Sequence, residues 1–142
     1  MKAFFGRRYT FSASHRLHTE ALSEEQNSAA YGKCNNPHGH GHNYIVEVLV
    51  GGQIDAETGM VIDLARLDAV VQAAVLERFD HTNLNLDPMF SNRVPTTENL
   101  CKAVFQLLQE PVAPAKLAHV RVEETENNSF EFYGEGSNGN DD

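Results

Sequence analysis

One short stretch of the chain gathers residues that can bind a metal ion or move a proton. Residues 32–44 read GKCNNPHGHGHNY and contain one cysteine and three histidines. His38, His40 and His42 occupy alternate positions, and alternate side chains of an extended strand point to the same side. Two of these imidazoles, His40 and His42, can therefore reach one point, and three imidazoles around an open fourth position would form a catalytic zinc centre, where zinc acts as a Lewis acid. The spacing therefore suggests a metal site.

A third imidazole could come from His15, at the end of an earlier strand. Residues 5–15 alternate in polarity, which predicts a half-buried strand whose apolar row ends at His15. A bare H-x-H pair is more often a polar strand start than a metal site. A third histidine at the end of a separate strand shifts the balance toward a metal, so the candidate ligands are His15, His40 and His42 taken together. His38 ranks below them because a proline and a glycine flank it, but spacing alone leaves a His38–His40 pair open.

Cys34 lies in the loop just before these histidines, next to Lys33. A thiol near a cation or a metal loses its proton more readily and can act as a base or a nucleophile. The alternatives are an inert loop cysteine and a fourth zinc ligand. Cys101 is expected in the core, because it lies on the apolar stripe of a predicted helix.

Acidic groups near the ends of two predicted elements are further candidates. Asp80 and His81 follow a predicted helix, where a carboxylate can orient an imidazole and raise its basicity. The simpler interpretation is a histidine favoured by the helix dipole. Glu123, Glu124 and Glu126 lie in or after a strand, and a solvated acidic strand end is the default interpretation for each.

Hydrophobic periodicity and turn residues predict the elements that must position these groups. Asp63 is the predicted N-cap of the first long helix, and Thr96 or Thr97 of the second. The predicted elements are strands over 5–15 and about 40–50, helices over 63–79 and 98–110, and strands over 116–125 and 129–135, with one short helix near 23–31. This order lacks a strand–helix–strand rhythm and predicts an α+β fold, a four-stranded antiparallel sheet with two helices on one face. Its open edges favour assembly of subunits.

Length, composition and net charge limit the classes of function that are open to this chain. The 142 residues, 41% of them hydrophobic, suit a single domain, assigned to residues 1–134, with a tail over 135–142 that is expected to be disordered. A net charge of −9 argues against nucleic acid and anionic membranes as partners, but not against a small phosphorylated substrate. We find neither a signal-peptide pattern nor a membrane-spanning apolar run, so a cytoplasmic location is expected.

Five segments together resemble a known family. FSASHRL, GKCNNPHGHGHNY, FDHTNLN, PTTENL and VEETENN occur in the order and spacing of the 6-pyruvoyltetrahydropterin synthase family, and the resemblance extends from about Phe4 to Tyr133. It implies the T-fold (tunnelling fold), in which trimers close a barrel and pair into homohexamers, with active sites between subunits. It also implies Zn²⁺ as cofactor, and the implied zinc ligands are His15, His40 and His42.

The same resemblance implies roles for the remaining candidates. Cys34 would be the proton-abstracting thiol, assisted by Asp80 and His81 from a neighbouring subunit. Glu124 would hold the 2-amino-pyrimidinone edge of a pterin, because a carboxylate accepts two parallel N–H bonds there. The backbone around the pair Thr96 and Thr97 would form the rest of the pterin pocket.

The implied activity is that of a zinc-dependent lyase that converts 7,8-dihydroneopterin triphosphate to 6-pyruvoyltetrahydropterin and releases triphosphate. His38 departs from the mammalian-type motif, which has asparagine there. The related 6-carboxytetrahydropterin synthases of queuosine biosynthesis commonly place three residues between the cysteine and the first histidine of the H-G-H pair. Here three residues separate Cys34 from His38 and five separate it from His40. The flanking residues favour the second register and the pyruvoyl product. The carboxy product stays open, as does a pterin- or zinc-binding protein without catalysis.

Overall fold

The computed structural model describes residues 2–134, so the predicted disordered tail over 135–142 lies outside the described residues. Its centre is a five-stranded sheet in the order β3-β1-β2-β4-β5. The predicted four-stranded antiparallel sheet is confirmed, and a two-residue strand, β3, is added parallel to β1 at one edge. The strands are β1 Lys2–His15, β2 His40–Gln53, β3 Thr82–Asn83, β4 Lys116–Thr125 and β5 Asn128–Phe132.

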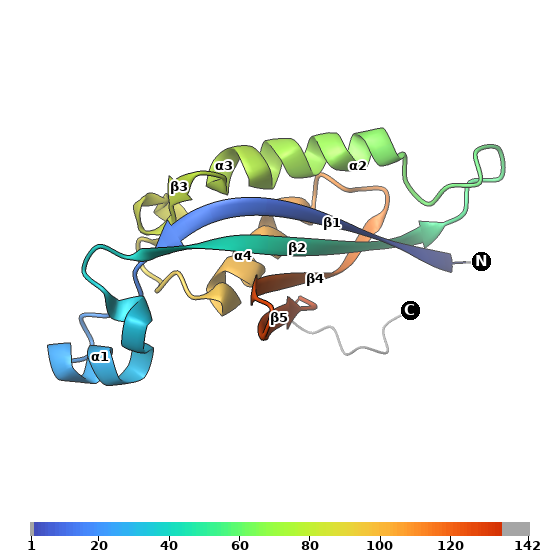
Figure 1. The fold of residues 1–142 in the computed structure, drawn as a ribbon. Helices are drawn as coiled ribbons and strands as arrows, with labels where there is room; N and C mark the ends of the chain where they lie inside the picture. Colours follow the sequence, from blue (N-terminus) through green and yellow to red (C-terminus); the bar gives the residue numbers. More distant parts are fainter. Residues whose placement is uncertain (1, 135–142) are drawn as a thin grey trace.

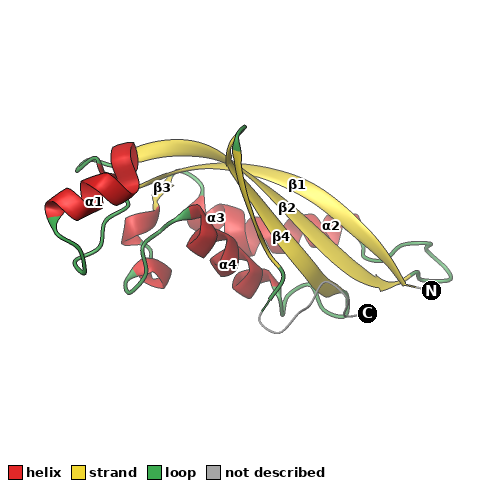
Figure 2. Cartoon of the chain, turned by 90° about the horizontal axis from the view of Figure 1, so that it is seen from below, coloured by secondary structure: helices red, strands yellow, loops and turns green. Residues whose placement is uncertain are grey.

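The two predicted long helices cover one face of this sheet (Figures 1 and 2). The first comprises α2 Leu64–Val71, a π-helical segment at Gln72–Leu76 and α3 Glu77–Phe79, and the second is α4 Thr97–Leu108. Asp63 caps α2 by accepting the Ala65 N–H, as predicted. Thr96 rather than Thr97 caps α4, because its hydroxyl accepts the Asn99 N–H.

The core lies between the helices and this face of the sheet, which explains the alternating polarity of the strands. Cys101 belongs to it, 1% exposed, with its thiol 3.2 Å from the Val120 carbonyl oxygen, so its predicted core position is confirmed. The other large core residues include Phe11, Tyr44, Val46, Val48, Leu67, Val71, Val75, Phe79, Leu100, Val104, Leu108, Val120 and Val122. Burying such side chains supplies most of the folding free energy.

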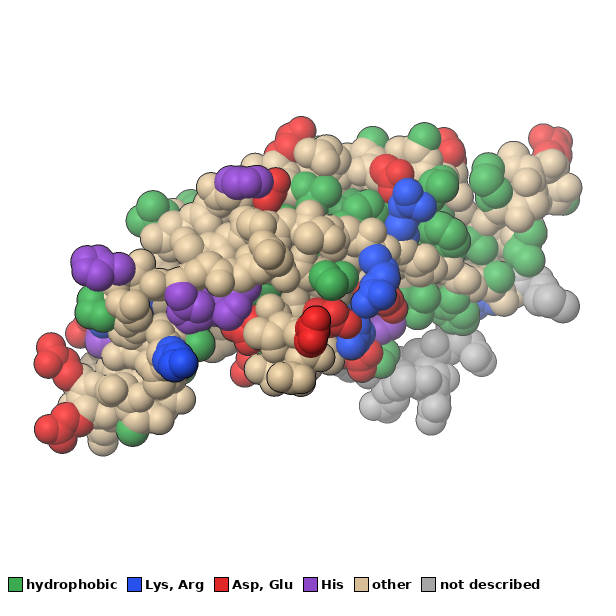
Figure 3. All heavy atoms as spheres, in the orientation of Figure 1, with side chains coloured by type: hydrophobic (Ala, Val, Ile, Leu, Met, Phe, Trp, Pro, Cys, Tyr) green, Lys and Arg blue, Asp and Glu red, His purple; other side chains and the backbone are tan. Residues whose placement is uncertain are grey.

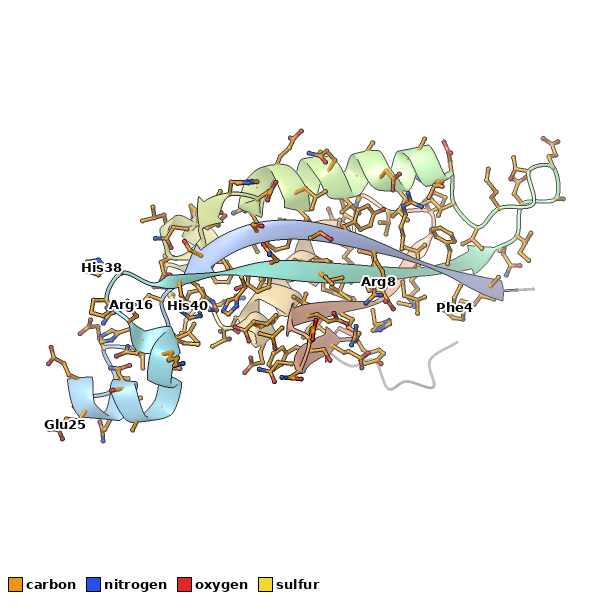
Figure 4. All side chains as sticks on the ribbon, viewed as in Figure 1. Phe4, Arg8, Arg16, Glu25, His38 and His40 are labelled. Carbon is orange, nitrogen blue, oxygen red and sulfur yellow. The ribbon has the colours of Figure 1, made fainter. Side chains whose placement is uncertain are left out.

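The opposite face of the sheet is charged. Arg8 lies 3.5 Å from Glu47 and 3.2 Å from Glu123, and Arg121 lies 2.6 Å from Glu123. Figure 3 shows basic and acidic side chains interleaved on this part of the surface, where Figure 4 labels Arg8. Glu123 is therefore directed away from the helices.

The loop between β1 and β2 carries the short predicted helix, α1 Glu24–Tyr31, capped by Ser23 in a capping box. Asn27, a residue of this helix, is fully buried, and its side chain bonds the N–H and carbonyl of Thr19 and the carbonyls of Leu22 and Ser23. This arrangement fixes the path of the chain into the cysteine segment. Within residues 2–134, we find no helix with both the length and the apolar character needed to cross a bilayer.

Candidate active site

The three candidate histidine ligands meet at the end of the sheet that carries α1. Antiparallel pairing places His15 opposite His40, and the next inward-facing position of β2 is His42. The Nε2 atoms of His40 and His42 are 2.7 Å apart, and each of these rings lies 4.9 Å from the His15 ring, centroid to centroid. One ligand atom from each of these histidines and from Glu124 lies within 4.8 Å of all the others. Histidine side chains also gather at this end in Figure 3.

His38 lies outside this cluster. Its side chain is exposed and projects from the loop before β2, whereas His40 points into the body of the protein (Figure 4). Gly39 turns the chain between them with φ +71°, and a Cβ there would lie 2.9 Å from the carbonyl oxygen of His15. The backbone therefore leaves strand geometry before His38, and the His38–His40 pair that the spacing left open does not form.

His15 is held in the tautomer that a metal ligand needs. It is 1% exposed, and its Nδ1–H donates to the Pro95 carbonyl over 2.8 Å. Because the proton is on Nδ1, the lone pair of Nε2 faces the cluster, where this atom has no hydrogen-bond partner among the described residues. Burial, with smaller contributions from the neighbouring histidines, lowers the pKa of His15 to about 4. Burial also lowers the pKa of His42, against an opposing effect of Glu124.

Glu124 closes the cluster from β4. Its Oε1 lies 3.1 Å from Nε2 of His42 and 3.5 Å from Nε2 of His15. The His15 nitrogen and the carboxylate oxygen are both lone-pair donors, and neutral imidazoles supply too few protons to bridge the whole group. A cation resolves this conflict, and three imidazole nitrogens with one carboxylate oxygen form a donor set that suits zinc. The residues present therefore fit the implied metal.

Cys34 lies beside this cluster in the turn Gly32–Asn35. Its backbone oxygen accepts the Leu17 N–H over 2.7 Å, and the Asn35 side chain donates to the Leu17 carbonyl. The Cys34 Sγ lies 3.6 Å from Nε2 of His40. Burial raises the pKa of the Cys34 thiol, and the negative charge of Glu124 raises it further. A bound cation would act in the opposite direction and favour the thiolate.

Asp80 and His81 form a pair of their own. His81 Nδ1 lies 3.0 Å from Oδ1 of Asp80, which also accepts the Ser12 N–H. That bond and His81 lower the pKa of the Asp80 carboxyl. His81 has φ +59°, the left-handed conformation that glycine usually adopts after a helix, and its N–H donates to Ser12. A side chain kept at such a position suggests a function.

This pair does not reach the histidine cluster within one chain. The His81 side chain is 83% exposed, and among residues 2–134 we find no bond from it to Cys34. It borders a 440 Å³ hollow that polar residues of β1, β2 and β3 line, namely Ser12, Ser14, His42, Asn43, Thr82 and Asn83. One chain therefore brings the thiol and the metal ligands together, but not the thiol and the assisting pair.

The predicted pocket residues Thr96 and Thr97 lie at the start of α4. Thr97 is 2% exposed, and its hydroxyl has no hydrogen-bond partner among the described residues.

Two groups of the site were not predicted from the sequence. Tyr44, whose hydroxyl lies 3.3 Å from Nδ1 of His15, follows His42 in the same period-2 row and could have been found from it. The Pro95 carbonyl gave no sequence signal.

Comparisons with known proteins identify relatives of this chain. The profile of the family described as 6-pyruvoyl tetrahydropterin synthase matches residues 5–135. The 6-pyruvoyl tetrahydrobiopterin synthase of Homo sapiens is 47% identical over 135 residues, which cover 94% of this chain and 93% of that protein. A putative 6-carboxy-5,6,7,8-tetrahydropterin synthase of Archaeoglobus fulgidus is 40% identical over 87 residues, 61% of this chain and 69% of that protein. The solved structure of Caenorhabditis elegans 6-pyruvoyl tetrahydropterin synthase superposes with a TM-score of 0.84 at 38% identity, covering 94% of this chain and 96% of that chain.

Proposed function

Because the chain belongs to the 6-pyruvoyl tetrahydropterin synthase family, we propose that it is a zinc-dependent lyase that converts 7,8-dihydroneopterin triphosphate to 6-pyruvoyltetrahydropterin. The observation that carries the proposal is the convergence of three imidazole nitrogens and a carboxylate, with a thiol sulfur 3.6 Å from one of those nitrogens. A metal-binding protein without catalysis has no need of that thiol, nor of a histidine oriented by Asp80.

The proposed ligands of zinc are His15, His40 and His42. A zinc ion held there would polarise the side-chain hydroxyls of the substrate and acidify the adjacent C–H bond. Cys34, as thiolate, takes the proton from that carbon. His81, oriented by Asp80, carries a proton to or from the reacting side chain as triphosphate leaves and the side chain tautomerises to a dicarbonyl.

Two groups are proposed to hold the pterin ring. Glu124 accepts two parallel N–H bonds from the 2-amino-pyrimidinone edge. The backbone at Thr96 and Thr97, at the start of α4, forms the adjoining wall.

The first test is the product. The purified protein with zinc should release triphosphate from 7,8-dihydroneopterin triphosphate, and mass spectrometry should identify 6-pyruvoyltetrahydropterin. A 6-carboxytetrahydropterin with a two-carbon aldehyde would instead assign the protein to queuosine biosynthesis, the alternative that the archaeal relative keeps open. Substrate binding without triphosphate release would contradict catalysis altogether.

The separation of His81 from Cys34 supports a composite site. We propose a homohexamer built from two trimers, each trimer closing its three sheets into a barrel, in which the Asp80–His81 pair of one subunit completes the site of another. This assembly also covers the open edges of the sheet. Since a catalytic thiol must stay reduced, the proposed location is the cytoplasm.

Mixed assemblies test this arrangement. Cys34→Ala and His81→Ala proteins should each be nearly inactive, and refolding them together should restore part of the activity, because some sites then combine an intact thiol with an intact histidine. Subunit exchange is verified by mass spectrometry of differently labelled chains. A mixture that has exchanged subunits but stays inactive would place both groups in one chain's site.

A further inference from the structure

Two basic side chains flank the segment that carries the proposed base. Arg16 directly follows β1, and Lys33 lies in the turn Gly32–Asn35 just before Cys34. Figure 4 labels Arg16 and His40 at the same end of the sheet, and in Figure 3 a basic side chain lies beside the histidines there. Within residues 2–134, neither cation has a carboxylate partner, although the chain has a net charge of −9. Four other arginines do have one, namely Arg7, Arg8, Arg78 and Arg121.

The fold holds Arg16 in place and leaves most of its guanidinium group available. The Arg16 N–H donates to the side-chain oxygen of Asn85 over 2.7 Å, and its carbonyl accepts from the same amide group over 2.9 Å. Its Nε–H donates to the Asn35 carbonyl over 3.3 Å. The two terminal nitrogens have no hydrogen-bond partner among the described residues. A guanidinium group fixed in this way presents a planar pair of donors that matches two oxygens of a phosphate group.

The order of the groups around the histidines gives the substrate a direction. The Oε1 of Glu124 lies 3.1 Å from Nε2 of His42, whereas the Sγ of Cys34 lies 3.6 Å from Nε2 of His40. A pterin ring held at Glu124, with its side-chain hydroxyls at the metal, therefore extends toward the thiol. The triphosphate group is attached to the last carbon of that side chain, so it lies beyond the metal, on the side of the thiol and the two cations.

We propose that Arg16 and Lys33 bind the triphosphate group of the substrate and select the phosphorylated pterin over 7,8-dihydroneopterin. This inference rests on the proposed function, because the direction of the substrate is set by Glu124 and the metal. Arg16 donates its terminal N–H groups to phosphate oxygens, and the ammonium group of Lys33 adds a charge that can follow the flexible anion. Two local cations thus allow a strongly acidic chain to accept a polyanionic substrate.

Equilibrium binding of two pterins tests this role without turnover. The measurements use the zinc-loaded Cys34→Ala protein, which lacks the proposed base, and mass spectrometry verifies that 7,8-dihydroneopterin triphosphate stays intact. Adding Arg16→Gln or Lys33→Gln should weaken the affinity for this compound by about 10-fold, the lower end for a hydrogen bond to a charged group. The affinity for 7,8-dihydroneopterin, which has no phosphate, should stay the same.

Two further variants serve as controls. Lys116→Gln makes the same change of charge at an exposed position at the other end of β4, and it should keep both affinities. Arg16→Lys keeps the charge but loses the planar pair of donors, so it should recover only part of the triphosphate affinity. The Lys33 variant should fold even if an Arg16 variant does not, because the Lys33 side chain is exposed and makes no bond within the described residues.

Unchanged affinity for the triphosphate compound in both glutamine variants would overturn the proposal. An equal loss for both pterins would also overturn it, because it would show that the cations only support the shape of the site. Triphosphate release by the wild-type protein is measured in parallel. Release combined with affinities that do not depend on the two cations would contradict this inference alone. A loss confined to the triphosphate compound, without release by the wild type, would support the inference and contradict the proposed catalysis.

Discussion

Replacing Cys34 by alanine should lower turnover by about 10²–10⁴-fold, the usual contribution of a general base, while zinc and pterin binding change little. The thiol lies beside the histidine cluster, but the proposed ligands and their support from Pro95 do not depend on it. Loss of the base should therefore appear in kcat rather than in affinity. Turnover of 7,8-dihydroneopterin triphosphate and equilibrium binding of 7,8-dihydroneopterin measure the two effects separately.

The pH profile identifies the thiol. Burial and the charge of Glu124 raise the pKa of Cys34 in the metal-free chain, so the thiol is protonated at low pH and becomes a base only as pH rises. The wild-type rate should rise with pH through this ionisation, and Cys34→Ala should lack that limb. Cys101→Ala, which removes the buried thiol in the core, is the control and should keep the limb.

Two outcomes would change the assignment. A Cys34→Ala protein that works at the wild-type rate would remove the thiol from the mechanism. Loss of zinc in that variant would make the thiol a metal ligand, because a base that only transfers a proton does not hold the metal.

The second large effect concerns the metal. His15→Ala and His42→Ala should each weaken zinc affinity by more than about 100-fold, since even outer-shell partners are worth about 10–100-fold, and activity should fall in parallel. His38→Ala should bind zinc like the wild type, because that side chain lies outside the cluster. Competition with a chromophoric chelator measures the affinities, and circular dichroism verifies that each variant folds.

The pattern of losses distinguishes the two registers of the motif. Zinc lost in His38→Ala but kept in His42→Ala would show that the wrong pair of histidines had been assigned. It would also favour the carboxy product, because the spacing from Cys34 to His38 is the one common among the 6-carboxytetrahydropterin synthases.

The sequence alone determined the elements and the side of the sheet on which the histidines lie. Its alternating strands, its Asp63 cap and its two apolar helical stripes predicted the α+β arrangement, which is the T-fold of the family. Period-2 parity predicted that His15, His40 and His42 share a face. These features follow from local geometry, because successive side chains of a strand alternate and a cap bonds residues two or three positions away.

Tertiary structure decided what parity could not. The turn at Gly39 separates His38 from the pair it could have joined. The pairing of β4 with β2 brings Glu124 to the histidines of β2, although a solvated strand end was its default interpretation. The Pro95 carbonyl fixes the tautomer of His15 from 80 residues away. Such contacts depend on where distant segments meet when the helices pack on the sheet, and no periodicity within either segment encodes that meeting.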